Sequence, residues 1–185
     1  MKGNYYLLMI LMAIWSIQGC TQNQKTGAGL DTAEGMNVET SLADDDITGF
    51  FNKAASGGMM EVQLGTTAEQ NSRSQGVKNF GTMMVKDHGK ANEELKALAA
   101  AKNITLPATI SEDHQKHVNE LTPLRGPEFD EKYMKMMVDD HQEDIELFEK
   151  AAKFNDAEVS AFANKTLPVL RKHLVAAKKI SDGLK

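Results

Sequence analysis

The sequence predicts an all-α fold: an antiparallel bundle of four long helices, with a short extra helix between the second and the third. Apolar residues recur at spacings of three and four along four long segments, which is the period of an amphipathic helix. No segment shows the alternation that is typical of a half-buried strand. Tight polar turns join the first segment to the second and the third to the fourth, so we expect the helices of each pair to be antiparallel.

The N-terminal region is typical of a bacterial lipoprotein signal. Lys2 precedes an uncharged apolar run over residues 5–17, which is shorter than the roughly 20 residues that a membrane-spanning helix needs. The run ends in Ile-Gln-Gly-Cys, which resembles a lipobox, and Cys20 is the only cysteine of the chain. We therefore expect residues 1–19 to be a lipoprotein signal peptide and Cys20 to be lipidated. The alternative is an ordinary signal peptide followed by a coincidental cysteine.

Residues 20–45 are expected to form a flexible tether behind the lipid. They are rich in Thr, Gly, Asn, Gln and Asp, and their few apolar residues follow no period, so they cannot bury enough surface to offset their ordering entropy. The folded domain is then expected over residues 46–182. A lipid anchor would place it in the cell envelope. Thr21 after the cysteine is not an inner-membrane retention aspartate, so analogy favours the outer membrane, with the domain facing the periplasm.

The charge of the chain excludes one class of partner. The formal net charge is −5 at pH 7, and no stripe of basic residues is present, whereas domains that bind nucleic acids carry a basic patch. We therefore expect no nucleic-acid partner. Contact with the membrane is expected to come from the lipid, because no basic amphipathic helix would add to it. No motif indicates a protein partner.

The first two long helices are separated by a short polar break. The first is predicted over residues 47–68, where Asp44, Asp45 and Asp46 can cap its positive end. The second is predicted over residues 75–102. Its apolar stripe consists of Val77, Phe80, Met84, Ala91, Leu95 and Leu98.

The connection after the second helix carries the short extra helix. It is predicted over residues 110–121, where Thr109 and Glu112 have the spacing of a capping box. Prolines and a glycine then break the chain. The third long helix is predicted over residues 127–154, because Pro127 suits a first helical turn.

The fourth long helix is predicted over residues 156–181, with Asp156 as its cap. Pro168 lies inside this pattern, and we expect it to kink or interrupt the helix. Two tight helix pairs joined by a long crossover have the connectivity of a ferritin-like bundle rather than of a simple up-and-down one.

Two six-residue segments of the predicted helices are nearly identical. Residues 83–88 read MMVKDH and residues 136–141 read MMVDDH, so five of the six positions agree. One interpretation is a relic of helix duplication that carries no chemistry. The other is a pair of equivalent ligand positions that face each other across the bundle.

Four polar residues are expected to meet at the centre of the bundle. His88, His141 and His173 lie on the apolar stripes of the second, third and fourth helices. Glu61 lies on the first helix, and all four residues are within about one and a half turns of the helix midpoints. Burying such groups unpaired would cost roughly 1–3 kcal/mol each. A metal ion or a closed hydrogen-bond network would remove that cost.

Glu61, His88, His141 and His173 are therefore the candidate metal ligands, in a site that suits zinc or iron. The methionines of the same helices are most simply packing residues of the core, although thioether sulfur would favour copper.

Four further polar residues leave two interpretations open. Asp87 and Asp140 directly precede two of the histidines, so they cannot share the same helix face. They either accept a hydrogen bond from a histidine of a neighbouring helix or are solvated. His114 and His117 lie three residues apart on the short helix, where they form either a weak surface metal site or simply an exposed polar face.

Several motifs along the domain carry a family resemblance. They are residues 51–65 (FNKAASGGMMEVQLG), 84–88 (MVKDH), 106–107 (LP) and 126–130 (GPEFD), Tyr133, residues 137–138 (MV) with His141, and residues 167–168 (LP) followed by His173. On these motifs, residues 46–179 resemble an uncharacterised family of predicted bacterial outer-membrane proteins. The resemblance implies a ferritin-like helical bundle and an envelope location, and it brings no established reaction.

The sequence departs from the di-iron oxidases that share this connectivity. Those enzymes use a Glu-x-x-His motif on two helices and single glutamates on the other two. Here the residues three positions before the histidines are Val85, Val138 and Leu170, so most of the carboxylates are missing. The first hypothesis is thus a non-enzymatic metal-binding envelope protein. The alternatives are a structural or interaction module without metal, and a redox enzyme related to the di-iron oxidases.

Overall fold

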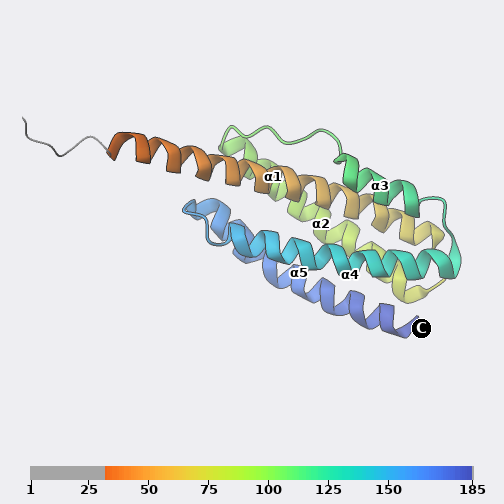
Figure 1. Ribbon diagram of the computed structural model, residues 1–185. Helices are drawn as coiled ribbons and strands as arrows, with labels where there is room; N and C mark the ends of the chain where they lie inside the picture. The colour runs from red at the N-terminus through yellow and green to blue at the C-terminus, as the bar shows by residue number, and fades with distance from the viewer. Residues whose placement is uncertain (1–31, 185) are drawn as a thin grey trace, which may run out of the picture.

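The computed structural model describes residues 32–184, and over that range the chain forms five α-helices and no strand (Figure 1). The helices are α1 (Thr32–Asn71), α2 (Gln75–Ala101), α3 (Glu112–Leu121), α4 (Gly126–Ala151) and α5 (Ala157–Gly183). The all-α prediction is confirmed. Within this range no helix combines the length and the hydropathy needed to cross a membrane. The expected signal peptide and Cys20 lie outside the described residues.

Two antiparallel helix pairs form the bundle. α1 packs along α2 and α4 packs along α5, while α1 also contacts α4 and α2 contacts α5. The first pair approaches closely because glycines meet at its crossing: a Cβ atom added to Gly65 would lie 2.7 Å from the carbonyl oxygen of Gly81. After α2 the chain returns along the bundle through α3, which lies against α1 and α4 (Figure 1). The predicted ferritin-like connectivity is confirmed.

Side-chain caps mark the start of three helices, with Ser74 capping α2. Asp156 caps α5 as predicted, because its Oδ1 atom accepts hydrogen bonds from the backbone N–H groups of Glu158 and Val159. The short helix differs from its prediction. It begins after Ser111, whose side chain caps it, rather than after Thr109.

Pro168 does not interrupt α5, contrary to one of the two outcomes expected for it. The helix is continuous over Ala157–Gly183 with the proline inside. The N–H group that proline lacks would have bonded the carbonyl of Asn164, one turn earlier. Both residues are exposed, so water can bond that carbonyl and the loss is tolerated.

α1 begins earlier than predicted. Its first residue is Thr32 rather than Ile47, so the structure differs from the flexible segment expected over residues 32–45. This stretch has no apolar period, but it contains helix-favouring alanine, glutamate, leucine and methionine and no proline. Because each residue added to an existing helix gains a hydrogen bond at little cost, the packed part of α1 can extend into it. In Figure 1 these first turns project beyond the other helices.

A polar layer divides the apolar core into two clusters. One cluster is rich in phenylalanine and contains Phe50, Phe51, Phe148 and Phe162. The other is rich in methionine and aromatic residues, namely Met60, Met84, Met134, Met137, Phe80, Phe129 and Tyr133. On α2, α4 and α5, a buried histidine lies between the residues of one cluster and those of the other. The bundle thus positions three imidazoles at one height, and its buried methionines pack as core residues.

Candidate metal site

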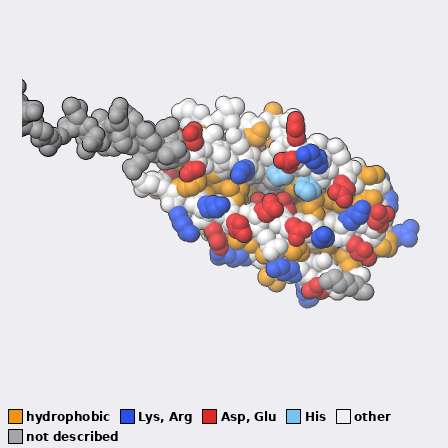
Figure 2. Space-filling view, in the orientation of Figure 1, with side chains coloured by type: hydrophobic (Ala, Val, Ile, Leu, Met, Phe, Trp, Pro, Cys, Tyr) orange, Lys and Arg blue, Asp and Glu red, His pale blue; other side chains and the backbone are white. Residues whose placement is uncertain are grey.

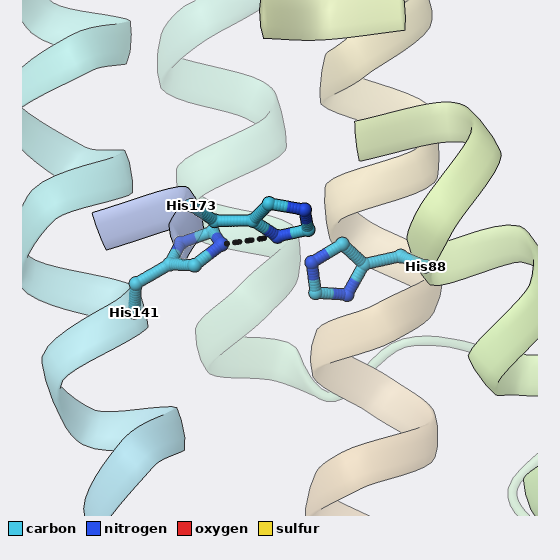
Figure 3. A group of neighbouring side chains, drawn as sticks. All are labelled: His88, His141 and His173. Carbon is cyan, nitrogen blue, oxygen red and sulfur yellow. Dashed lines mark hydrogen bonds between the residues drawn. The ribbon is translucent and has the colours of Figure 1, made fainter. Parts of the chain in front are cut away.

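Three buried imidazoles from three helices converge in the polar layer. His88 comes from α2, His141 from α4 and His173 from α5, and Figure 3 shows their rings gathered together. The Nε2 atom of His141 lies 3.4 Å from Nδ1 of His173. One nitrogen of each ring lies within 4.8 Å of the other two, which is close enough for one metal ion to bind all three. The structure therefore brings together the three histidines that the helical pattern placed inside.

Two of the rings are held from outside by hydrogen bonds. His141 Nδ1 donates to the backbone carbonyl of Met137, one turn earlier, at 2.9 Å. His173 Nε2 donates to the carboxylate of Asp87 on α2, at 3.0 Å. These partners assign the proton of each neutral ring to its outer nitrogen. The inner nitrogens of His141 and His173 then face each other with lone pairs, as metal-binding histidines do when a carbonyl or a carboxylate orients them.

His88 also has a carboxylate on its outer side, although the contact is a short distance rather than a well-directed hydrogen bond. Its Nδ1 atom lies 2.6 Å from Oε2 of Glu61. Its Nε2 atom is buried and has no hydrogen-bond partner in the described part of the chain. A third lone pair is therefore available on the inner side, next to the pair formed by His141 and His173.

Burial keeps these rings neutral. Burial, and then the neighbouring His88 and His173 rings, lower the pKa of His141 to about 3. Burial also lowers the pKa of His88 and of His173, although Asp87 acts in the opposite direction on both. The contact that Figure 3 marks between His141 and His173 would need one inner nitrogen to be protonated, and hence a charged ring. Neutral imidazole is the form that binds metals.

Glu61, expected as a fourth ligand, reaches the same layer from α1 but on its outer side. The side chain is fully buried. Its Oε2 atom faces His88 Nδ1, and its Oε1 atom lies 3.3 Å from His141 Nδ1. Glu61 is thus placed to orient two imidazoles, and it does not belong to the group formed by the three histidines. Burial raises the pKa of its carboxyl to about 8, partly offset by the neighbouring Asp140.

The two aspartates that precede histidines have different surroundings. Asp87 accepts a hydrogen bond from a histidine of a neighbouring helix, which confirms one of the two interpretations. Asp140 lies beside Glu61 instead, and its Oδ2 atom is buried without a hydrogen-bond partner among the residues that the structure describes. Burial and the charge of Glu61 raise the pKa of Asp140 well above its ordinary value.

Asp144 is a member of this layer that the sequence pattern did not single out. Burial, and then the charges of Glu61 and Asp140, raise the pKa of its carboxyl well above the usual range. The signal that could have found it is its spacing, because Asp144 follows Asp140 by four residues and His141 by three on one side of α4.

A small cavity adjoins the imidazoles. Its volume is about 30 Å³, and His88, His173, Asn92 and Thr166 are among its lining residues. That volume holds a ligand of the size of water. Gly58 leaves the space that Asn92 occupies, because a Cβ atom there would collide with the amide oxygen of Asn92. Three nitrogen ligands beside room for a small molecule are typical of open rather than closed metal sites.

His114 and His117 do not belong to this layer. The hydroxyl group of Ser56 donates to His114 Nδ1 at 2.6 Å and accepts from the backbone N–H of Ser111 at 2.8 Å. His114 therefore helps to fasten α3 to α1, while His117 is exposed. Figure 2 shows histidine side chains at the surface with acidic side chains around them.

Comparisons with known proteins agree with this architecture. The crystal structure of a DUF305 fragment from Deinococcus radiodurans superposes with a TM-score of 0.66 and 12% identity, covering 74% of this chain and 95% of that one. At such low identity the likeness shows a common helical fold alone. No curated protein matches the sequence. The family model of a domain of unknown function, DUF4142, matches residues 31–180, which include every residue of the polar layer. The chain therefore belongs to the DUF4142 family.

Proposed function

We propose that this protein binds one transition-metal ion through His88, His141 and His173. The observation that carries the proposal is the 3.4 Å separation of the inner nitrogens of His141 and His173. The outer nitrogen of each ring carries the ring proton and donates it to Met137 or Asp87, so each inner nitrogen has a lone pair. Two facing lone pairs need a proton or a cation near them, and burial opposes the extra proton. Nitrogens bound to one tetrahedral ion at about 2.0–2.1 Å lie about 3.3 Å from each other, which is close to the observed spacing.

The donor set supports zinc or iron as the bound metal. Neutral imidazoles suit zinc, iron and copper, and the adjoining cavity leaves room for a water ligand. Copper would be favoured if thioether sulfur joined the site. The buried methionines pack within an apolar cluster beside the layer, so we place copper second. Because Val85, Val138 and Leu170 replace the glutamates of di-iron oxidases, we propose metal binding without di-iron chemistry.

Metal analysis of the full chain, purified without an affinity tag, tests the function. We expect one equivalent of zinc or iron per chain after dialysis against a buffered metal solution. The His141→Ala variant should lose that equivalent. His117→Ala removes an exposed imidazole outside the layer and should keep it. A wild-type protein that binds no metal, or equal loss in both variants, would contradict the proposal.

We further propose that the domain is anchored to the envelope by a lipid on Cys20, after removal of residues 1–19, and that it faces the periplasm from the outer membrane. The apolar run and the lipobox-like end of that run support this. Labelled palmitate should be incorporated into the wild-type chain and not into Cys20→Ser. Absence of label from the wild type would refute the anchor and would leave the metal proposal unaffected.

A further inference from the structure

The geometry points to a second cation site beside the three histidines, formed by the carboxylates of Glu61 on α1 and Asp140 on α4. We infer that it takes a hard divalent cation such as Mn²⁺. The site lies on the outer side of the His141 ring, opposite the inner nitrogen that faces His173. It uses different ligand atoms from the three-histidine site, so it does not require that site to be filled.

The two carboxylates are close together and lack donors. Glu61, Asp140 and His141 each offer one ligand atom within 4.8 Å of the others. Both oxygens of Glu61 and the Oδ2 atom of Asp140 are buried without a well-directed hydrogen bond from any residue in the described range 32–184. Two carboxylates can satisfy each other only through a shared proton, because an ionised carboxylate has no donor of its own. A divalent cation between them would satisfy both.

His141 contributes less to this second site than its position suggests. Its Nδ1 atom lies 3.3 Å from Oε1 of Glu61, but it donates its proton to the carbonyl of Met137 at 2.9 Å. The protein ligands are therefore the carboxylates, with water in the remaining positions. Oxygen ligands of this kind suit Mn²⁺, Mg²⁺ and Ca²⁺ rather than softer ions.

The surrounding charge is uncompensated. Within residues 32–184, no lysine or arginine forms an ion pair with Glu61, Asp140 or Asp144. Burying several carboxylates without a positive partner is unfavourable, and a bound cation would offset this cost. The hydroxyl group of Tyr133 is also buried and has no hydrogen-bond partner within the described range. Burial, and then the charges of Glu61 and Asp140, raise its pKa well above the usual value. It can donate to a carboxylate or to a water ligand of the cation.

Asp140 connects this site with the surface. It lines two surface grooves, and Glu143 and His117 line both of them with it. A hydrated cation can therefore reach Asp140 from solvent without passing through the apolar clusters. The small cavity beside the three histidines is lined from α1, α2, α4 and α5, and Asp140 is not among its lining residues.

Manganese titration of the full chain tests the second site. Free Mn²⁺ is followed by its six-line electron paramagnetic resonance signal, with and without one equivalent of Zn²⁺, and zinc is counted by metal analysis. We expect the wild type to bind one Mn²⁺ under both conditions. Asp140→Asn should lose the manganese equivalent and keep zinc. Asp139→Asn is the matched control, because Asp139 is an exposed neighbour on α4, and it should bind Mn²⁺ as the wild type does.

Two results would overturn the second site: a wild-type chain that binds no Mn²⁺, or an Asp140→Asn variant that binds it as tightly as the wild type. The wild-type result is decisive even if the variant fails to fold. Zinc binding that fails while Mn²⁺ binds through Asp140 would refute the function proposed above and support this site. Zinc binding through the histidines without any binding of Mn²⁺ would support the proposed function and refute this second site.

Discussion

The two sides of the polar layer differ in how their polar atoms are satisfied. On the inner side, His88, His141 and His173 present nitrogens whose rings are oriented by a carbonyl or a carboxylate. On the outer side, Glu61 and Asp140 present oxygens with no donor directed at them. The first side is organised in the way that a metal site requires. The second side is an excess of buried acid, which a proton or a cation must neutralise.

The difference shows how the helices fix the side chains of the layer. Each imidazole is fixed by a group from its own helix or a neighbouring one, so the bundle itself sets the inner geometry. Glu61 takes part in both sides, because its oxygens face the outer nitrogens of two rings while its carboxylate lies beside Asp140. His141 is also shared, because its Nδ1 atom lies 3.3 Å from Oε1 of Glu61. A substitution should therefore affect one side alone everywhere except at Glu61 and His141.

The largest expected effect is stabilisation by metal on the histidine side. Zinc at 100 times its Kd should stabilise the folded chain by about 2.7 kcal/mol. For a chain of this length that corresponds to a rise in Tm of about 5–10 °C. Thermal unfolding with zinc and with chelator measures it. His141→Ala should abolish the difference, and a Tm that chelator leaves unchanged in the wild type would favour the structural-module alternative.

Loss of an orienting group should weaken the same side without destroying it. Asp87→Ala frees the Nε2 atom of His173 and should lower zinc affinity about 10–100-fold. Competition with a chromophoric chelator measures the change. Asp139→Ala removes the same charge from an exposed position, and equal affinities for the two variants would show that Asp87 does not orient the ring.

The carboxylate side should make the free energy of unfolding depend on pH. The pKa of Glu61 is about 8 in the folded chain and 4.5 in the reference state, so between these values the folded chain holds a proton that the unfolded chain has lost. Metal-free stability should therefore fall as the pH rises, by at most about 1.4 kcal/mol per pH unit from this group. The histidines do not oppose the fall above pH 6.5, since their depressed pKa values act below it. Urea unfolding from pH 6.5 to 8 should show a shallower slope for Glu61→Gln, and identical slopes would argue against a protonated Glu61.

The smallest effect is expected at the cavity. Gly58→Ala should displace the Asn92 side chain and destabilise the chain by about 1 kcal/mol. Gly89→Ala on α2 meets nothing within 4 Å and should stabilise it by up to about 1 kcal/mol. Chemical unfolding measures the change in the free energy of unfolding for each variant. A decrease for Gly58→Ala with an increase for Gly89→Ala would support Asn92 in the cavity wall, whereas an increase for both would contradict that position.

The sequence predicted the inner side better than the outer one. Histidines on apolar stripes mark inward faces, so His88, His141 and His173 could be placed in the core from helical periodicity alone. Asp140 and Asp144 lie on the edge of such a stripe, where an acidic residue is usually solvated, and only the packing of α4 against α1 shows that they are half-buried near Glu61. Periodicity also could not tell which nitrogen of each ring faces inward.

The helix boundaries were also only partly predictable from local sequence patterns. Asp156 was recognised as a cap from residue type, whereas the helical start at Thr32 depends on propagation from the packed part of α1. The continuity of α5 through Pro168 depends on the exposure of Asn164, which the sequence does not state. In each case a tertiary environment decided what a local pattern left open.

X-ray absorption at the zinc edge, on the full chain loaded with one equivalent, tests the central claim most directly. Three imidazole nitrogens at about 2.0–2.1 Å, with the outer-ring scattering that histidine gives, are the expected first shell, and His173→Ala should remove one of them. A first shell without imidazole scattering, or one with sulfur at about 2.3 Å, would contradict the convergence of His88, His141 and His173 on a metal ion.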